Sequence, residues 1–283
     1  MIRKYLILMG IILNIFTVAG CRQLLNARVG TRTDVGERDS LCESAVYEIT
    51  DTDRETKGEA ATEISLDQLA GEILTIEHGG TYTFRGKSKN CRIVVNAYDD
   101  EIVHLILEGI ELYAKDGPAV YIQKAGKVII TTKEGTENVI SDSAEYSTPW
   151  EACIFSSCDL TLNGKGKLNV YGYYHDGIRS KDHLKVIETE LYVKAKNNGI
   201  RGNDGVVIEN SNIQVESEGT GILTNSEDGY VVISNGICKV TSGENAIYAD
   251  SYVSVQKCDS VLYSVEEAVK CNGVREIEGA DGK

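Results

Sequence analysis

A short pattern of apolar positions recurs along the second half of the chain. In each copy a small residue or a cysteine precedes a β-branched residue, as in Gly177-Ile178-Arg179 and Gly199-Ile200-Arg201. Successive β-branched centres are 34, 24, 22, 22, 25 and 22 positions apart, and they are Val120, Ile154, Ile178, Ile200, Ile222, Ile247 and Val269. A near-constant period of this length indicates stacked repeats, each of which buries its apolar side only against its neighbours.

Two further apolar columns keep the same period. They stand six positions after the centres, at Leu184, Val206 and Val253, and fifteen positions after them, at Val193, Val215 and Leu262. The segments around them are short, rich in β-branched residues and bounded by Gly, Asn, Asp and Ser, which favours strands over helices. We therefore predict an all-β protein, a right-handed parallel β-helix (solenoid) of about eight turns with about 22–25 residues in each turn.

The chain before the first full repeat continues this pattern less regularly. Three segments there read as strands of earlier turns, at 81–84, 92–95 and 103–107. The spacing of 34 between Val120 and Ile154 predicts an inserted loop at 141–149. Loops on a rigid scaffold often carry binding residues.

The first residues are typical of an export signal. Arg3 and Lys4 precede an apolar run that is too short for a bilayer span of about 20 residues. The run ends in Val18-Ala19-Gly20-Cys21, which resembles the lipobox of bacterial lipoproteins. We predict cleavage before Cys21, lipidation of Cys21, and an exported, membrane-anchored lipoprotein that faces the cell exterior. An ordinary signal peptide with an incidental cysteine is the alternative.

These patterns divide the chain into three regions. Residues 1–20 are the predicted lipoprotein signal peptide, and residues 63–283 are the predicted β-helix domain. Residues 21–62 are polar and lack a clear period, so we predict a flexible tether there.

Charge changes the picture of possible partners. The chain has 29 Lys and Arg against 43 Asp and Glu, a formal charge of −14, and loss of Arg3 and Lys4 with the signal peptide takes it to −16. Nucleic acid is therefore excluded as a partner, because the basic surface that binds phosphates is missing. A carboxylate-rich protein favours cations, or partners that it reaches through cations.

Cysteines do not define the fold. The chain has eight, an odd seven if Cys21 is lipidated, and those within the repeat do not share one column. No disulfide ladder is therefore predicted, and buried thiols are expected instead.

Acidic and amide side chains recur at fixed offsets from the centres. Asp176 and Asn198 stand two residues before successive centres, Asn203 stands three after, and Asp182 and Asp204 stand four after. Equal offsets in a solenoid lie about 4.8 Å apart. Ca²⁺ takes six to eight oxygen ligands, so these five residues form a predicted calcium site. The alternative is that they cap turns through Asx-type hydrogen bonds.

Cationic and aromatic residues accompany these acids. Arg179 and Arg201 share one column. Two guanidinium groups at this spacing repel each other unless anions pair with them. Those anions are either Asp182 and Asp204 or the carboxylates of an acidic polymer. Lys181 lies in the column of Asn203. Flat rings suit sugar faces, and those in or beside the inserted loop are Tyr146, Trp150, Tyr173 and Tyr174. We expect all seven residues to contact a polysaccharide, with packing within the loop as the alternative for the aromatic residues.

Several of these runs resemble a known family. The T-Y-T-F-R-G run at 81–86, the segment 99–109, and the H-D-G-I-R-S-K-D run at 175–182 with its N-G-I-R-G-N-D copy at 198–204 are similar to the carbohydrate-binding β-helix domain first seen in a cellulolytic clostridial surface protein. The resemblance covers about residues 75–273. It implies a pectate-lyase-like fold and an association with calcium, cellulose and acidic plant polysaccharides such as pectin. In the third copy, Gly221-Ile222-Leu223 is flanked by threonines and has lost both acid and base, which implies a shorter calcium strip here.

Two classes of function follow. The first is a lipid-anchored, non-catalytic module that binds an acidic polysaccharide with the help of Ca²⁺. The second is a calcium-dependent polysaccharide lyase, in which an Arg or Lys removes a proton acidified by the metal. A structural or adhesion protein is a weaker alternative. Neither a G-x-S-x-G turn nor an H-E-x-x-H motif is present, so serine and zinc hydrolysis have no support, and no catalytic residue is assigned.

Overall fold

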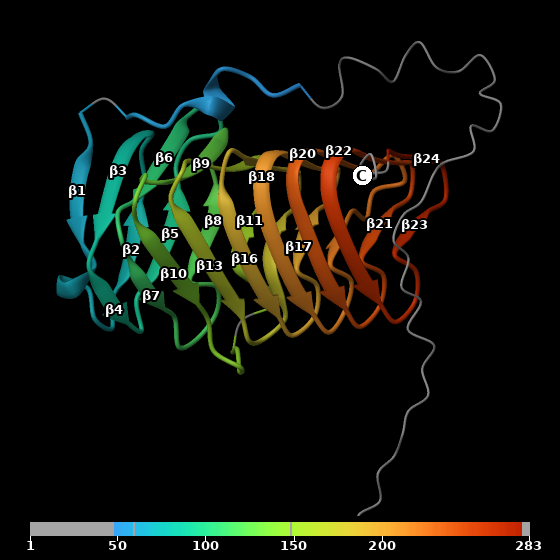
Figure 1. Cartoon of the computed structure of the whole chain (residues 1–283). Helices are drawn as coiled ribbons and strands as arrows, with labels where there is room; N and C mark the ends of the chain where they lie inside the picture. Colours follow the sequence, from blue (N-terminus) through green and yellow to red (C-terminus); the bar gives the residue numbers. More distant parts are fainter. Residues whose placement is uncertain (1–47, 59, 148, 279–283) are drawn as a thin grey trace, which may run out of the picture.

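The protein is a parallel β-solenoid, seen side-on in Figure 1. The computed structural model describes residues 48–58, 60–147 and 149–278. Each turn passes through three faces. Face 1 is a nine-stranded sheet that takes one strand from each turn. The described residues therefore form nine turns, where about eight were predicted. The strands of face 1 are β2 (Ile73–Ile76), β5 (Arg92–Asn96), β8 (Val120–Lys124), β11 (Ala152–Ser156), β14 (Asp176–Ser180), β17 (Ile200–Gly202), β19 (Ile222–Leu223), β21 (Ile247–Ala249) and β23 (Val269–Cys271).

Faces 2 and 3 belong to one fifteen-stranded sheet, because from the sixth to the eighth turn a single long strand covers both faces. Face 2 contains β1 (Thr62–Ser65), β3 (Gly80–Arg85), β6 (Ile102–Leu107), β9 (Lys127–Thr132), β12 (Leu160–Asn163), β15 (His183–Ile187) and β24 (Val274–Ile277). Face 3 contains β4 (Lys87–Lys89), β7 (Glu111–Tyr113), β10 (Glu137–Ser141), β13 (Lys167–Gly172) and β16 (Glu190–Ala195). The strands shared by both faces are β18 (Gly205–Ser217), β20 (Tyr230–Ser242) and β22 (Tyr252–Ser264). Two short 3₁₀ helices, η1 (Thr52–Arg54) and η2 (Leu66–Gln68), precede β2.

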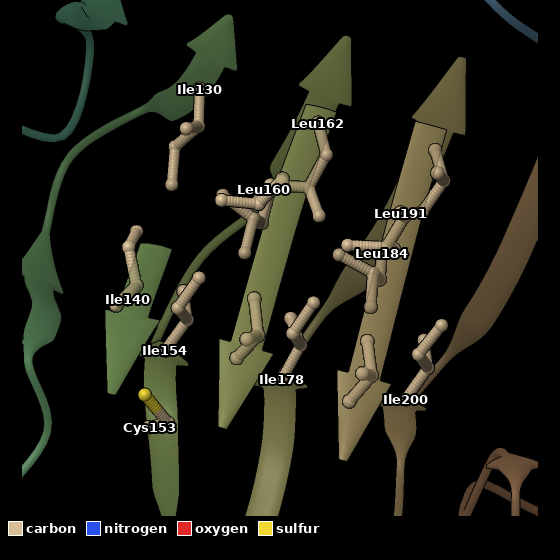
Figure 2. Packing of buried hydrophobic residues seen from close by; sticks show 14 of the residues in the cluster. Ile130, Ile140, Cys153, Ile154, Leu160, Leu162, Ile178, Leu184, Leu191 and Ile200 are labelled. Carbon is tan, nitrogen blue, oxygen red and sulfur yellow. The ribbon is translucent and has the colours of Figure 1, made fainter. Parts of the chain in front are cut away.

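The predicted register is confirmed in all three apolar columns. Each repeat centre pairs with the next along face 1, from Val120 with Ile154 to Ile247 with Val269. Leu184 pairs with Val206 on face 2, and Val193 pairs with Val215 on face 3. The columns line one continuous core, in which isoleucines of face 1 point towards leucines of the other faces (Figure 2).

The bends between faces 2 and 3 share one backbone feature. A residue with positive φ occupies equivalent bends, at Gly164, Glu188, Asn210, Asn235 and Lys257. A left-handed residue turns the chain sharply between two extended segments, which is why small and polar residues break the apolar pattern there.

The cysteines contribute to the core as thiols. Cys91, Cys153, Cys238 and Cys258 are buried, Cys158 and Cys271 are half-buried, and none of these six forms a disulfide. Cys21 and Cys42 lie outside the described residues, as does the predicted signal peptide.

The inserted loop lies where it was predicted, whereas part of the predicted tether is attached to the solenoid. The connection between β10 and β11 is the long one, as the spacing predicted. Residues 48–58, which belonged to the predicted flexible tether, instead run along face 2 towards β1 (Figure 1). We call this segment the strap.

Candidate functional site

The five predicted calcium ligands divide between two corners of the solenoid. Asp176 and Asn198 lie where face 3 turns into face 1, and Asp182, Asn203 and Asp204 lie where face 1 turns into face 2. Strand β14 (Asp176–Ser180) lies between them and rises about 3.3 Å per residue, so its two ends, beside Asp176 and Asp182, are about 13 Å apart. The structure therefore does not bring all five into one cage.

The first corner, which we call the ladder corner, is a chain of hydrogen bonds across successive turns. The Asp176 Oδ1 atom accepts from the Asn198 backbone N at 3.0 Å and from the Nδ2 atoms of Asn198 and Asn197, both at 2.9 Å. Asn198 Oδ1 in turn accepts from the backbone N of Thr220 at 3.0 Å. These bonds join residues 21 or 22 positions apart, so they are not local Asx caps, but they do engage Asp176 and Asn198 in structural hydrogen bonds.

Asp176 also lies beside two basic side chains in this corner. Its side chain is fully buried, His175 Nδ1 lies 3.0 Å from Oδ1, and Arg201 Nη1 lies 3.7 Å from Oδ2. The hydrogen bond to Asp176 raises the pKa of His175, although partial burial opposes the shift. Among the described residues, neither Asp176 Oδ2 nor Arg201 Nε has a hydrogen-bond partner, and the half-buried Arg201 has Asp176 and Glu151 as its neighbouring anions.

The predicted pair of arginines is present on face 1, but other anions answer it. Arg179 and Arg201 are neighbours across β14 and β17. Arg179 Nη1 contacts Glu151 Oε2 at 3.2 Å, and Arg201 Nη1 lies 3.7 Å from Asp176 Oδ2. Among the described residues, neither arginine forms an ion pair with Asp182 or Asp204. Burial, and then the charge of Arg179, lower the pKa of Arg201.

Lys181 and Arg179 both lie over one aromatic ring. The Lys181 Nζ and Arg179 Cζ atoms are each 5.6 Å from the centre of the Phe155 ring, within the range of cation–π contacts. Lys181 is exposed and Arg179 is half-buried, so face 1 presents two cations to solvent beside the second corner.

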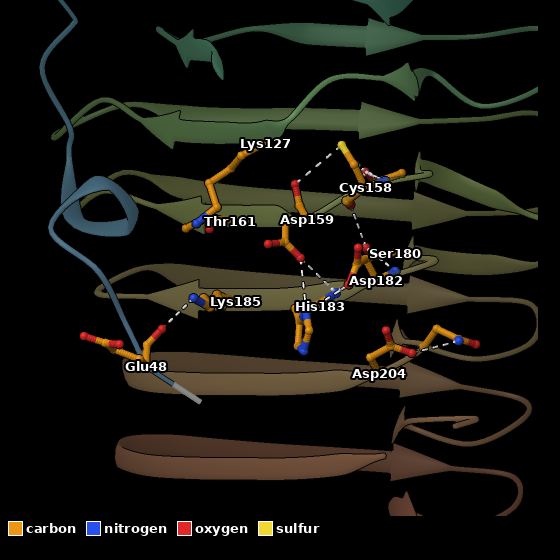
Figure 3. Close-up of polar contacts among 12 residues, drawn as sticks. Glu48, Lys127, Cys158, Asp159, Thr161, Ser180, Asp182, His183, Lys185 and Asp204 are labelled. Carbon is orange, nitrogen blue, oxygen red and sulfur yellow. Dashed lines mark hydrogen bonds and ion pairs between the residues drawn. The ribbon is translucent and has the colours of Figure 1, made fainter. Parts of the chain in front are cut away.

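The second corner, which we call the acidic corner, gathers carboxylates around one histidine (Figure 3). His183 Nδ1 lies 3.2 Å from Asp159 Oδ1 and 2.9 Å from Asp182 Oδ1. These three residues are all half-buried, and each offers a ligand atom within 4.8 Å of the others. Asp204 occupies the next turn, where its Oδ1 accepts from Asn203 Nδ2 at 3.1 Å.

The pKa values of Asp159 and Asp182 shift in opposite directions. Burial works to raise the pKa of Asp159, but the hydrogen bond from His183 and its charge outweigh burial and lower it. Burial, and the negative charges of Asp159 and Asp204, raise the pKa of Asp182. The hydrogen bond to Asp159 raises the pKa of His183. The corner thus holds more negative charge than its single histidine neutralises, which favours a cation.

Asp159 was missed in the sequence because of its offset. It stands five residues after its centre, Ile154, whereas Asp182 and Asp204 stand four after theirs. The register of β12 and β15 pairs Leu160 with Leu184, which aligns Asp159 with His183 and places it diagonally from Asp182. The sequence signal was an acid and a histidine in the same column, directly before two leucines.

Each of the four predicted aromatic residues packs against another aromatic ring. Tyr146 and Tyr174 stack at 4.1 Å, and Trp150 lies 4.4 Å from Tyr121. Tyr146 also donates to the buried Asp142 Oδ2 at 2.5 Å, which gives it a structural role in the loop. Tyr173 is the most accessible of the four, with 50% of its surface exposed.

Asp142 is the other buried carboxylate of the ladder corner. Burial raises its pKa to about 6, although hydrogen bonds from the Tyr146 hydroxyl and the Tyr173 backbone N oppose the shift. The loop between β10 and β11 is therefore held by a carboxylate whose ionised form is disfavoured.

A hollow of about 340 Å³ lies on the same edge as the acidic corner, nearer the start of the solenoid. It is lined by Glu77, His78, Asn96, Ala97, Tyr98 and Lys124. Tyr98 is 60% exposed and was not singled out from the sequence. An open aromatic ring with amide, ammonium and carboxylate groups around it has the composition of a sugar-contact surface.

No helix within the described residues is long and apolar enough to cross a membrane.

Comparison with known proteins gives consistent results. A family model described as "Carbohydrate-binding domain-containing protein" matches residues 70–282. A protein of the same description from Acetivibrio thermocellus is 35% identical over 215 residues, which cover 72% of this chain and 75% of that protein. A solved structure, described as a polysaccharide lyase-like protein from C. thermocellum in a gadolinium derivative, matches with a TM-score of 0.73 and 29% identity, over 78% of this chain and 97% of the other.

Proposed function

The chain belongs to the family of carbohydrate-binding domain-containing proteins, and from this premise we propose that it binds acidic polysaccharide through Ca²⁺ held at the acidic corner, without cleaving the polymer. The observation that carries the proposal is the cluster of Asp159, Asp182 and His183, with Asp204 on the next turn. The two corners share the repeat, but only this one combines accessible carboxylates with an unbalanced negative charge.

The donor chemistry of the corner fits Ca²⁺ in part. Asp159, Asp182 and Asp204 supply carboxylate oxygens, and Asn203 adds an amide, whereas Ca²⁺ takes six to eight oxygens in flexible arrangements. An incomplete protein ligand set leaves positions for water and for the ligand. Gadolinium, used in the derivative of the solved neighbour, is likewise a hard cation that prefers oxygen.

A bridging cation also resolves a conflict of charge. The chain has a formal charge of −14 and should repel a polyuronate. Ca²⁺ at the corner would accept uronate carboxylates in its open positions and reverse the local sign. Lys181 and Arg179 on the adjoining face would pair with further carboxylates along the polymer.

The test compares the wild-type protein with Asp182→Ala, Asp204→Ala. Calcium should raise the melting temperature of the wild type, because a ligand bound to the native state stabilises it by RT ln(1 + [L]/Kd), about 2.7 kcal/mol at a hundred times Kd. Chelation should lower the melting temperature and reduce retention on polygalacturonate, and the double variant should behave like the chelated wild type.

Arg179→Ala is the matched control for that test. It should weaken retention on polygalacturonate and leave the calcium-dependent rise in melting temperature in place. If chelation changes neither retention nor melting temperature in the wild type, the acidic corner has no metal function.

The second candidate function is a polysaccharide lyase, which the description of the solved neighbour favours. A lyase would release unsaturated products from polygalacturonate in the presence of Ca²⁺, and their ultraviolet absorbance would rise with time. We propose binding without cleavage, so retention of polymer should be found with constant absorbance.

Membrane anchoring is a further part of the proposal. Cys21 lies outside the described residues, and the lipobox in the sequence supports its lipidation. Since stable anchoring depends on acyl chains, Cys21→Ser should move the protein from the membrane to the soluble fraction. Equal partition of Cys21→Ser and wild type would contradict lipid anchoring.

A further inference from the structure

The strap, residues 48–58, is fixed to face 2 through one buried side chain. Among its residues only Asp53 is buried, with 0% of its surface exposed, and Ile49 and Gly58 are half-buried. The strap lies over β9, β12 and β15, where the outward side chains Thr131, Thr161 and Asn163 are buried.

Asp53 accepts hydrogen bonds from three turns of the solenoid and, at Oδ2, from the backbone N and the hydroxyl of Thr50 within the strap. Its Oδ1 atom accepts from Lys127 Nζ and from Thr161 Oγ1, both at 2.7 Å, and its Oδ2 atom accepts from Lys185 Nζ at 2.8 Å. The two lysine side chains are only 16% and 11% exposed. Burial works to raise the pKa of Asp53, but the bonds from the two lysines and Thr161 outweigh it and hold that pKa well below its usual range.

The remaining contacts of the strap with the solenoid are hydrogen bonds and ion pairs. Asn163 Nδ2 donates to the backbone oxygens of Asp53 and Glu55, and Lys185 Nζ donates to the backbone oxygen of Glu48. Arg54, which is exposed, pairs with Glu188 and Glu209. Because little apolar surface holds the strap in place, its attachment depends mainly on what fills the space between the two lysines.

The face beneath the strap is built to receive a carboxylate. Lys127 and Lys185 lie on either side of β12 with both ammonium groups directed at one carboxylate, and loss of that carboxylate leaves two neighbouring positive charges without their shared anion. This site adjoins the acidic corner: Thr161 is two residues after Asp159, and Lys185 is two residues after His183 (Figure 3). A cation-binding group and an anion-binding group therefore stand side by side on one edge.

We propose that Lys127, Thr161 and Lys185 form a binding site for carboxylates of an acidic polysaccharide, and that Asp53 of the strap occupies this site in cis as a displaceable substitute. The inference rests on the proposed function for the class of ligand. A uronate carboxylate would replace the Asp53 carboxylate at the lysines, with one set of charge-assisted hydrogen bonds exchanged for another. Neighbouring carboxylates of the same polymer would reach the acidic corner at the same time.

The experiment measures retention of the full chain on polygalacturonate in excess chelator, which removes the calcium-dependent contribution. Asp53→Ala should bind roughly tenfold more tightly than wild type, because the lysines are vacated. The matched control is Asp51→Ala, which removes one charge from an exposed position of the same strap and should bind like wild type. Adding Lys127→Met to Asp53→Ala should abolish the gain.

Two results would overturn the proposal. One is equal retention of Asp53→Ala and Asp51→Ala, which would assign any gain to net charge. The other is measured on the wild type, so it does not depend on whether the variants fold. Hydrogen exchange at the Thr50 and Asp53 amides should accelerate when polygalacturonate binds, and it should stay constant with a neutral glucan. Polymer binding without acceleration would mean that the strap is a permanent part of the fold.

These outcomes are distinct from failure of the calcium proposal. If chelation leaves retention and melting temperature of the wild type unchanged but Asp53→Ala gains binding, the carboxylate site stands and the calcium site fails. If the wild type responds to Ca²⁺ and Asp53→Ala gains nothing, the reverse holds.

Discussion

The ladder corner and the acidic corner begin from the same repeat and end with opposite properties. At the ladder corner, Asp176 is fully buried and accepts three hydrogen bonds at Oδ1 beside Arg201 and His175. At the acidic corner, Asp182 has 45% of its side chain exposed, and its neighbours include the carboxylates Asp159 and Asp204. Recurrence of an acid in a solenoid therefore does not identify a metal site: the partners supplied by adjacent turns decide between a structural bond and a free ligand.

The difference in hydrogen bonding between the two corners also determines whether an acid contributes to stability or to ligand binding. Burial of an acid is tolerated where donors on the next turn satisfy it, and such an acid has little remaining capacity for a ligand. An acid that its neighbours repel contributes little to folding and remains available to a cation. Substitution at the two corners should therefore have different consequences.

The largest contrast is expected between Asp176→Ala and Asp182→Ala. Asp176→Ala removes the nearer anion of the half-buried Arg201 and the buried acceptor of the Asn198 backbone N and of two side-chain amides, so it should cost about 3–5 kcal/mol of unfolding free energy. Asp182→Ala removes a repelled, partly exposed charge and should stay within about 0.5 kcal/mol of wild type. Chemical denaturation in the absence of Ca²⁺ measures both.

The effect of Ca²⁺ on the melting temperature should show the opposite order for the two variants. Asp176→Ala should keep its rise in melting temperature with Ca²⁺ if it still folds, whereas Asp182→Ala should lose most of it. Equal destabilisation by the two substitutions would show that both acids have structural roles.

A smaller effect is expected from pH at the ladder corner. The pKa of Asp142 is about 6 in the folded protein, against 3.8 ordinarily, so the folded state holds its proton more tightly than the unfolded state. Its contribution to stability is fully present below pH 3.8 and is lost as pH rises through 6, a decrease of up to about 3 kcal/mol at about 1.4 kcal/mol per pKa unit.

Asp142→Asn isolates this contribution. Between pH 4 and pH 7 the variant should gain stability relative to wild type, as measured by urea unfolding at each pH. A difference between the two proteins that is constant with pH would mean that Asp142 ionises normally in its loop.

The sequence predicted the fold well because burial repeats with the period of the turn. Ile178, Ile200 and Ile222 are inward-facing at each turn, and an apolar column of this kind is visible without any structure. The site was predicted less completely, because polar residues are placed by local bends. Asp159 is one position out of register with Asp182, and it reaches His183 only through the pairing of β12 with β15.

The strap could not have been predicted from periodicity. Its attachment depends on Asp53, one acid in a polar segment, and its partners Lys127 and Lys185 lie 74 and 132 positions away. Long-range polar contacts of this kind leave no pattern in a single sequence, which is why the segment read as part of a tether.

The strap also sets the path along which force would travel through the protein. The chain reaches the solenoid at β12 and β15, through Asp53 and Lys185, before it continues to β1 at the far end. Tension applied ahead of Glu48 would load these central strands first, so that the hydrogen bonds between β1 and β3 are not peeled apart one by one from the edge of the sheet. Under tension, the ion pairs of Asp53 would therefore bear the load before the hydrogen bonds of the terminal turn do.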